Sequence, residues 1–152
     1  MQEAMQTEIL EGIRPCRTAE EIRRTFPVMR QLRPHLSEDG YVEQVTRMAS
    51  SQDFHVAAAY HGGKPVAVAG YRFVESLSWG RFLYVDDLAT EEAERSLGHG
   101  ANLLAWLVSQ ARQRGCGQFH LDSGVQRHAA HRFYLRERMD ITCFHFARSL
   151  EP

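Results

Sequence analysis

Three consecutive runs of strand-forming residues in the middle of the chain constrain its fold more than any other feature. The runs Phe54–Tyr60, Pro65–Glu75 and Arg81–Thr90 are enriched in Val, Tyr and Phe, which favour the pleated surface of a sheet. The turn sequence His-Gly-Gly-Lys joins the first two and is typical of a β-hairpin. Because short connections join antiparallel neighbours, the three runs predict an antiparallel meander.

The segment that follows the meander predicts a crossover connection. Apolar residues recur at helical spacing over Leu103–Arg112, and either Gly115 or Gly117 can end this helix. A further strand is predicted over Phe119–Asp122. A strand–loop–helix–strand unit brings its second strand back parallel to the first. Phe119–Asp122 should therefore lie parallel to Arg81–Thr90.

Two helices are predicted ahead of the meander. Thr18 and Glu21 form a capping box, so the first helix should begin directly after Thr18. Pro27 is a possible kink in this helix and Pro34 its stop. Ser37 can cap a second helix. The apolar face of that second helix consists of Tyr41, Val45, Met48 and Ala49.

The remaining segments complete a single α+β domain over residues 1–152. Its central sheet is expected to be mixed and mostly antiparallel, with one parallel pair of strands. The flanking elements are a strand over Glu8–Arg14, a helix over about Gln126–Glu137 and a final strand over Ile141–Ala147.

The composition restricts the classes of partner. The 152 residues carry a net charge of -1, so the broad basic surface of most nucleic-acid and anionic-membrane binders is not expected. The first residues do not resemble a signal peptide. The cysteines Cys16, Cys116 and Cys143 are widely spaced, which is typical of free thiols in a reducing compartment. We therefore expect a cytoplasmic protein that binds neither nucleic acid nor a membrane.

The stretch Arg-Ser-Leu-Gly-His-Gly-Ala, residues 95–101, lies between a predicted strand and the amphipathic helix. The first N–H groups of a helix lack intrahelical acceptors and form the positive end of its dipole, and no obvious side-chain cap competes for them. Gly98 and Gly100 allow a phosphate to approach the backbone closely. Arg95 can add charge-assisted hydrogen bonds. The stretch therefore predicts an anion-binding site.

Two common nucleotide motifs do not fit this loop. The Walker motif requires a lysine directly after its second glycine, but Lys64 is the only lysine in the chain. The dinucleotide fingerprint requires a third glycine at the position that Leu103 occupies.

This loop resembles the acyl-CoA signature R/Q-x-x-G-x-G/A of the GNAT superfamily of N-acetyltransferases. It follows Val-Asp-Asp-Leu-Ala-Thr and precedes Asn-Leu-Leu-Ala-Trp-Leu, and the order of the predicted elements also resembles that of the family. The resemblance implies a three-layer α/β arrangement with helices on both faces of the sheet and a parallel strand pair that splays apart. It also implies acetyl-CoA as co-substrate.

The resemblance further assigns the residues that hold acetyl-CoA. The backbone at the end of the preceding strand would bind the pantetheine arm, at Leu88, Ala89 and Thr90. The loop and the helix N-terminus would hold the pyrophosphate, at Arg95, Ser96, Leu97, Gly98, His99, Gly100 and Ala101.

The sequence Ala-His-Arg-Phe-Tyr, residues 130–134, resembles a later helix of the family. There a tyrosine is the general acid for the departing CoA thiolate, and Tyr134 stands at that position. A phenol with a pKa of about 10 is protonated at neutral pH. Arg127 replaces the asparagine that the family usually has seven residues earlier, and it could bind a phosphate instead. Arg138 and Met139 replace a usual Gly-Phe pair, which affects only the local turn.

The general base is left open between two neighbouring carboxylates. Some family members have a glutamate where this chain has Tyr84, so the base role is assigned to Asp86 or Asp87. Because side chains alternate along a strand, one of the two should face the cleft. The alternative is that one pairs with an arginine such as Arg81. Further carboxylates that could attract a cationic amine are Glu75 and Asp122.

These residues predict an N-acetyltransferase that moves an acetyl group from acetyl-CoA to a primary amine by direct attack in a ternary complex. The acceptor would be a small-molecule or peptide amine, and a homodimer is a possible assembly. Two alternatives stay open. One is a non-catalytic regulatory module that binds acyl-CoA, and the other is a protein-interaction domain on the same fold.

Three histidines invite comparison with a metal site. His128 and His131 share a helical face, and His120 precedes them at a loose spacing. Three imidazoles can bind zinc, but surface histidines on an arginine-rich helix are the more common situation. No metal is expected.

Overall fold

The computed structural model describes residues 10–95 and 97–152. The chain divides into two compact units, Met1–His120 and Leu121–Pro152, and each is described by itself. The single domain expected over residues 1–152 stays a prediction.

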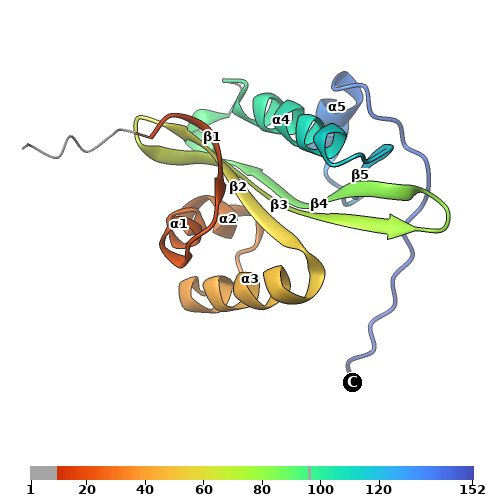
Figure 1. The fold of residues 1–152 in the computed structure, drawn as a ribbon, viewed down its shortest axis with the longest axis horizontal. Coiled ribbons are helices and arrows are strands. Elements are labelled where there is room, and N and C mark those ends of the chain that lie inside the picture. Colours follow the sequence, from red (N-terminus) through yellow and green to blue (C-terminus); the bar gives the residue numbers. More distant parts are fainter. Residues whose placement is uncertain (1–9, 96) are drawn as a thin grey trace, which may run out of the picture. The chain divides into compact units, whose positions relative to one another are not determined.

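Five strands within the described residues form one sheet in the order β1-β2-β3-β4-β5 (Figure 1). Strands β1 to β4 are antiparallel neighbours, which confirms the predicted meander. Strand β5 follows β4 in the order, and the two are parallel, as the crossover predicts. The bounds are β1 (Gly12–Cys16), β2 (Phe54–His61), β3 (Lys64–Ser76), β4 (Gly80–Thr90) and β5 (Gln118–Leu121).

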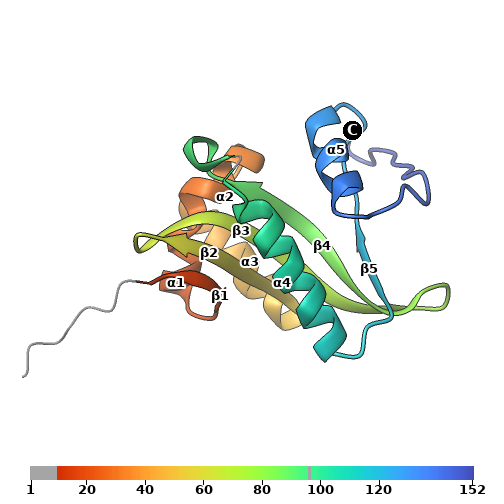
Figure 2. The same ribbon diagram turned by 90° about the horizontal axis from the view of Figure 1, so that it is seen from above.

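Helices cover both faces of the sheet in the first unit. Helices α1, α2 and α3 lie on one face and α4 on the other (Figures 1 and 2), so the expected mixed α+β architecture is confirmed. Helix α5 belongs to the second unit. The bounds are α1 (Ala19–Arg24), α2 (Phe26–Leu32), α3 (Glu38–Gln52), a 3₁₀ turn η1 (Glu92–Glu94), α4 (His99–Gln113) and α5 (His128–Arg136).

Side-chain caps begin the first and third helices where the sequence predicts them. The Thr18 hydroxyl accepts a hydrogen bond from the Glu21 amide at 3.1 Å, and the Ser37 hydroxyl accepts one from the Gly40 amide at 3.1 Å. Each cap satisfies a backbone donor that has no partner inside the helix.

The first predicted helix is in fact two helices, separated at Thr25. The buried Thr25 hydroxyl donates to the Ile22 carbonyl oxygen at 2.6 Å and lies 2.7 Å from the Tyr41 hydroxyl. Pro27 lies in the first turn of α2, where a missing N–H costs nothing because that N–H would have no helical acceptor. The expectation of a kink at Pro27 was therefore wrong, since this proline starts a helix.

The core beneath α1–α3 is built from side chains of these helices and of β1, β2 and β3. On α3, Tyr41, Val42 and Val45 are buried and Met48 packs against them. Ala49 is exposed, so its predicted place on the apolar face was wrong and Val42 takes part instead. The buried face of the helix is centred on Tyr41 and Val45, and Ala49 lies outside this face.

Helix α4 packs on the opposite face of the sheet. It begins at His99, four residues before the predicted start at Leu103, and its buried side chains include Leu107. The Trp106 ring meets the Tyr71 ring edge-on, with the ring centroids 6.3 Å apart. Gly115 follows the helix with a φ of 73°, a left-handed conformation that a glycine adopts without strain.

The final strand predicted over 141–147 is absent from the structure of the second unit. Residues 137–152 have no strand assignment, and Ile141, Phe144 and Phe146 are 75%, 83% and 92% exposed. An apolar alternating sequence becomes a strand only when another backbone supplies its hydrogen bonds, and the described residues supply none here. The α5 helix is also shorter than predicted, since it begins at His128.

Strand β4 contains one more residue than β3 requires. The register pairs Gly70 with Asp87 but Tyr71 with Val85, so Asp86 is the extra residue of a β-bulge. Bulges redirect side chains and are common beside active sites. This bulge decides where both aspartates point.

Gly70 is the residue that makes room opposite the bulge. A Cβ atom at this position would lie 2.5 Å from Asp87 Oδ2 and 2.6 Å from Phe54 Cζ. Gly70→Ala should therefore lower the free energy of unfolding by about 1–3 kcal/mol, the usual cost of overpacking a core, as measured by urea denaturation. Gly117→Ala is the control, because a Cβ there meets nothing within 4 Å. Equal stability of the two variants would contradict this account of Gly70.

Candidate functional site

The glycine-containing loop has the structure that an anion-binding site requires. Gly98 occupies the N-cap position of α4 with a φ of 85°, and no side chain caps the helix. The first intrahelical bond runs from the Asn102 amide to the Gly98 carbonyl oxygen at 3.0 Å. The amides of His99, Gly100 and Ala101 come before it and have no helical acceptor. These three residues are the first helical turn rather than a loop.

The fit to a coenzyme A pyrophosphate rests on this uncapped helix end. A Cβ atom at Gly98 would meet nothing within 4 Å, so the backbone is open to an approaching group. Arg95 and Leu97 are both exposed beside it. Ser96, also predicted to contact the pyrophosphate, lies outside the described residues. The described residues at the start of α4 therefore fit the pyrophosphate that the sequence predicts there.

A histidine pair flanks this helix end. His99 Nε2 lies 3.4 Å from Glu94 Oε2, and its ring centroid is 5.9 Å from that of His61 in the β2–β3 hairpin. Residues Leu88, Ala89 and Thr90, predicted to bind the pantetheine arm, form the end of β4 and pair with residues 67–69 of β3. Strand β4 thus leads from the aspartates toward the uncapped start of α4.

Both candidate bases form ion pairs with arginines. Asp86 receives two hydrogen bonds from Arg72, at 2.8 Å and 3.0 Å, and the Arg72 guanidinium lies 5.1 Å from the centroid of the Tyr84 ring. Asp87 Oδ1 accepts from Arg33 Nε at 2.8 Å, and Arg33 also donates to the Asp86 carbonyl oxygen at 3.0 Å. The arginine partners are therefore Arg33 and Arg72, and not the suggested Arg81.

The bulge overturns the expectation that the two aspartates lie on opposite faces of β4. Tyr71 packs against α4, so Arg72, the next residue of β3, points to the face of α1–α3. Arg72 binds Asp86 on this face, and Arg33, which follows α2, binds Asp87 there. The extra residue breaks the alternation and turns both carboxylates to the same side.

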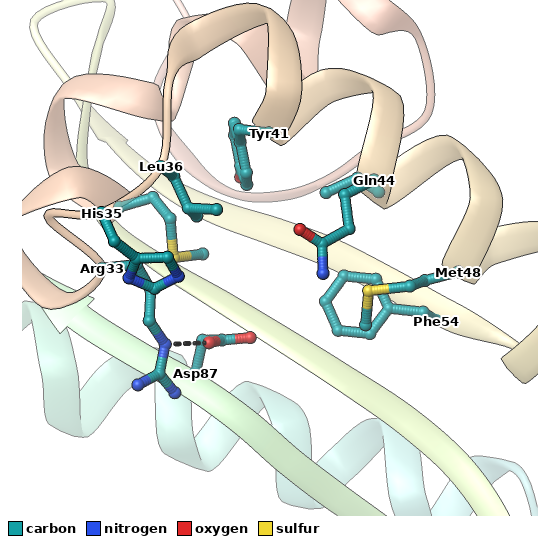
Figure 3. Close-up of a pocket in the computed structure, with 10 residues that line it drawn as sticks. Arg33, His35, Leu36, Tyr41, Gln44, Met48, Phe54 and Asp87 are labelled. Carbon is teal, nitrogen blue, oxygen red and sulfur yellow. Dashed lines mark hydrogen bonds and ion pairs between the residues drawn. The ribbon is translucent and has the colours of Figure 1, made fainter. Parts of the chain in front are cut away.

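A cavity of about 220 Å³ lies between β4 and the helices of this face (Figure 3). The Asp87 carboxylate points into it and is joined to Arg33, with His35 beside the pair. Its other lining includes Leu36, Gln44, Met48 and Phe54. Asp86 does not line this cavity. Of the two candidates, Asp87 is therefore the one beside a space that a substrate could enter.

The electrostatic setting of Asp87 favours a proton acceptor. Burial raises the pKa of this carboxyl above its ordinary value, while the hydrogen bond and charge of Arg33 lower it in part and the charge of Asp86 adds to the rise. A carboxylate with a raised pKa is a stronger base than one at the ordinary value.

The other carboxylates that the sequence suggested lie elsewhere. Glu75 is exposed near the β3–β4 turn. Asp122 is in the second unit, with its Oδ2 3.5 Å from His145 Nδ1. Neither of them lines the cavity.

Tyr134 and Arg127 belong to the second unit. Tyr134 lies on α5, and Arg127 occupies the N-cap position of the same helix. Burial raises the pKa of the Tyr134 hydroxyl, and the positive charge of Arg127 partly opposes this rise. The hydroxyl therefore stays protonated at neutral pH, as a general acid requires.

The suggested metal ligands have other contacts. The His120 ring stacks on Trp79 with centroids 3.7 Å apart, and His131 Nε2 lies 2.7 Å from the Gly124 carbonyl oxygen. Among residues 10–95 and 97–152, no group of three or more His, Cys, Asp or Glu side chains could hold a metal ion. In the same part of the chain, no helix is long and apolar enough to cross a membrane.

Sequence reasoning missed Arg33, Arg72, His35 and Gln44. Arg33 is 54 residues from Asp87, and nothing in the local pattern distinguishes it from other arginines. The only sequence signal was indirect, since two adjacent carboxylates in an apolar strand require cations nearby.

Comparison with known proteins gives the family. The sequence model of the acetyltransferase (GNAT) family matches residues 16–139. The uncharacterized N-acetyltransferase YhdJ of Bacillus subtilis (strain 168) is 33% identical over 115 residues, which cover 76% of this chain and 81% of that protein. The mixed sheet with its parallel β4–β5 pair agrees with this match. This chain belongs to the GNAT acetyltransferase family.

Solved structures agree in fold. The crystal structure of a transcriptional regulator from Bacillus halodurans C-125 has a TM-score of 0.78 at 21% identity, covering 91% of this chain and 98% of that one. The aminoglycoside N-acetyltransferase AAC(6')-Iy in complex with CoA has a TM-score of 0.78 at 14% identity, covering 91% of this chain and 93% of that one. The protein is an N-acetyltransferase by family.

The raised pKa of Asp87 makes stability depend on pH in a defined direction. Between the ordinary aspartate pKa of about 3.9 and the higher pKa in the folded state, the folded protein binds more protons than the unfolded chain. Stability therefore falls as the pH rises through this window. Asp87→Asn lacks the titrating group. As the pH rises, the free energy of unfolding of the wild type should therefore fall relative to that of the variant. Urea denaturation at a series of pH values tests this, and a difference that is constant with pH would exclude it.

Proposed function

We propose that this protein transfers the acetyl group of acetyl-CoA to a primary amine by direct attack in a ternary complex. The observation that carries the proposal is the position of Asp87 on β4. It lines a cavity on the face of α1–α3, and the same strand continues through Leu88–Thr90 toward the uncapped start of α4. One strand thus connects a basic group to an anion site.

The residues of the loop would hold the co-substrate. The amides of His99, Gly100 and Ala101 can donate to pyrophosphate oxygens, Arg95 can add a charged hydrogen bond, and Arg127 could bind a phosphate. Acetyl-CoA supplies the activated acetyl group, whose thioester C–S bond breaks as the bond to the amine nitrogen forms. The proposal places the pantetheine arm along the backbone of Leu88–Thr90.

Asp87 is the proposed base. An amine attacks only when it is neutral, so the ammonium form must first lose a proton. Asp87 Oδ1 is occupied by Arg33, and Oδ2 is proposed as the atom that takes this proton. Asp86 is held by two hydrogen bonds from Arg72, and its proposed role is to keep Arg72 and the bulge in place.

Tyr134 is the proposed acid. Its hydroxyl would donate a proton to the thiolate sulfur and recover one from the nitrogen that has formed the new amide bond. A phenol is protonated at neutral pH, and the burial that raises the pKa of this hydroxyl keeps it so.

The co-substrate site can be tested with a matched pair of glycine variants. Gly98 and Gly115 have φ values of 85° and 73°, and a Cβ atom at either would meet nothing within 4 Å. Alanine at either position should therefore lower the free energy of unfolding by about 1 kcal/mol. Acetyl-CoA at 100 times its Kd should stabilise the wild type by about 2.7 kcal/mol, as measured by thermal melting. Gly115→Ala should keep this shift and Gly98→Ala should lose most of it.

If acetyl-CoA gives no upward shift in the wild type, the proposed function is wrong. If Gly98→Ala and Gly115→Ala respond alike, the uncapped helix end is not the site.

Tyr134→Phe tests the acid and separates an enzyme from a binding module. General acid catalysis contributes about 10²–10⁴-fold, so kcat should fall by a factor in this range while the melting shift with acetyl-CoA is retained. Thiol release measures the rate. An unchanged kcat would remove Tyr134 from the mechanism, and a wild type that binds acetyl-CoA but releases no thiol with any amine would favour the regulatory module.

A further inference from the structure

The cavity beside Asp87 has a charged end and an apolar body. Asp87 and Arg33 form the charged end, joined at 2.8 Å. In Figure 3 the Phe54 ring and the Met48 side chain lie together away from this pair, and Leu36 lies across the cavity from them. A molecule that fills this space would place one polar group at Asp87 and hydrocarbon against the remaining wall.

The size of the cavity limits what can enter. Its volume of about 220 Å³ is below the roughly 300–1,000 Å³ of pockets that take drug-sized ligands. A single small amine fills this volume, whereas most of a molecule built from several linked sugar rings would lie outside it.

The charges of the cavity limit the acceptor further. Its lining includes the Asp87 carboxylate and the Arg33 guanidinium, and Arg33 already occupies one oxygen of that carboxylate. Among the described residues that line the cavity, no second carboxylate is present to pair with a second ammonium group, since the other polar side chains are His35, Tyr41 and Gln44. An unpaired charge against an apolar wall is strongly unfavourable.

We infer that this cavity binds the acceptor, and that the acceptor is a small primary monoamine with an apolar body. Its amino group lies at Asp87 Oδ2 and its hydrocarbon part lies against Met48 and Phe54. This inference rests on the proposed acetyl transfer and adds the substrate class to it. A polycationic acceptor, such as a polyamine or an aminoglycoside, should be a poor substrate because the described lining offers no second carboxylate.

A series of linear amines tests the apolar body. From ethylamine to pentylamine, kcat/KM should rise by about fourfold per methylene, which is the transfer free energy of a buried CH₂ expressed as a ratio, until the cavity is full. Cadaverine, the diamine with the chain length of pentylamine, should have a kcat/KM at least about tenfold lower, since a ratio of ten is only about 1.4 kcal/mol. Thiol release measures both.

Two tryptophan variants test the location. Gln44 lines the cavity from an exposed position on α3, so Gln44→Trp should fill part of it without entering the core. The KM for pentylamine should rise by about tenfold, or about 1.4 kcal/mol. The KM for acetyl-CoA and the melting temperature should not change. Glu43→Trp is the control, because Glu43 is exposed on the same helix and does not line the cavity.

The outcomes separate this inference from the proposed function. If amines are acetylated but cadaverine equals or exceeds pentylamine, the inference is overturned and the acetyl transfer stands. The same holds if Gln44→Trp and Glu43→Trp have equal effects. If no amine is acetylated and acetyl-CoA gives no melting shift, the proposed function is wrong and the inference falls with it.

Discussion

A single extra residue in β4 determines the chemistry of the first unit. Opposite Gly70 and Tyr71, Asp86 has no partner of its own in the register, and the strand turns two neighbouring carboxylates to one face. Two adjacent negative charges in a largely apolar setting repel each other and are costly to desolvate. Two arginines from different places in the sequence offset this cost by pairing with the aspartates. They are Arg72 on the neighbouring strand and Arg33 after α2.

The two ion pairs have different consequences. Arg72 and Asp86 lie on adjacent strands and tie the bulge to the sheet. Arg33 instead reaches from the segment between α2 and α3, and so it anchors that segment to β4 and forms one end of the cavity. Gly70 is part of the same arrangement, because any larger side chain would take the space of Asp87 and Phe54. The cavity thus depends on an ion pair, a glycine and a bulge that act together.

Much of the fold could be predicted from local patterns. The capping side chains of Thr18 and Ser37 begin helices where expected, and the turn sequence after β2 gives the meander. These predictions succeed because each depends on residues only a few positions apart. The absence of a side-chain cap on α4 could be predicted in the same way, but its start at His99 could not, since the sequence pattern placed it at Leu103. The expected strand over 141–147 failed because a strand requires another backbone, which no local pattern supplies.

The sequence by itself determined the order of the elements, the family resemblance and the glycine that opens the start of α4. Only the tertiary structure decided which aspartate faces a cavity. Alternation along β4 predicted that Asp86 and Asp87 would point in opposite directions, and the bulge reverses this because the register depends on the partner strand. The arginine partners were likewise beyond the sequence, since Arg33 and Asp87 meet across 54 positions. Long-range pairs form only where packing brings two segments together. The packing of α2 and α3 against the sheet is what places Asp87 in the lining of a cavity.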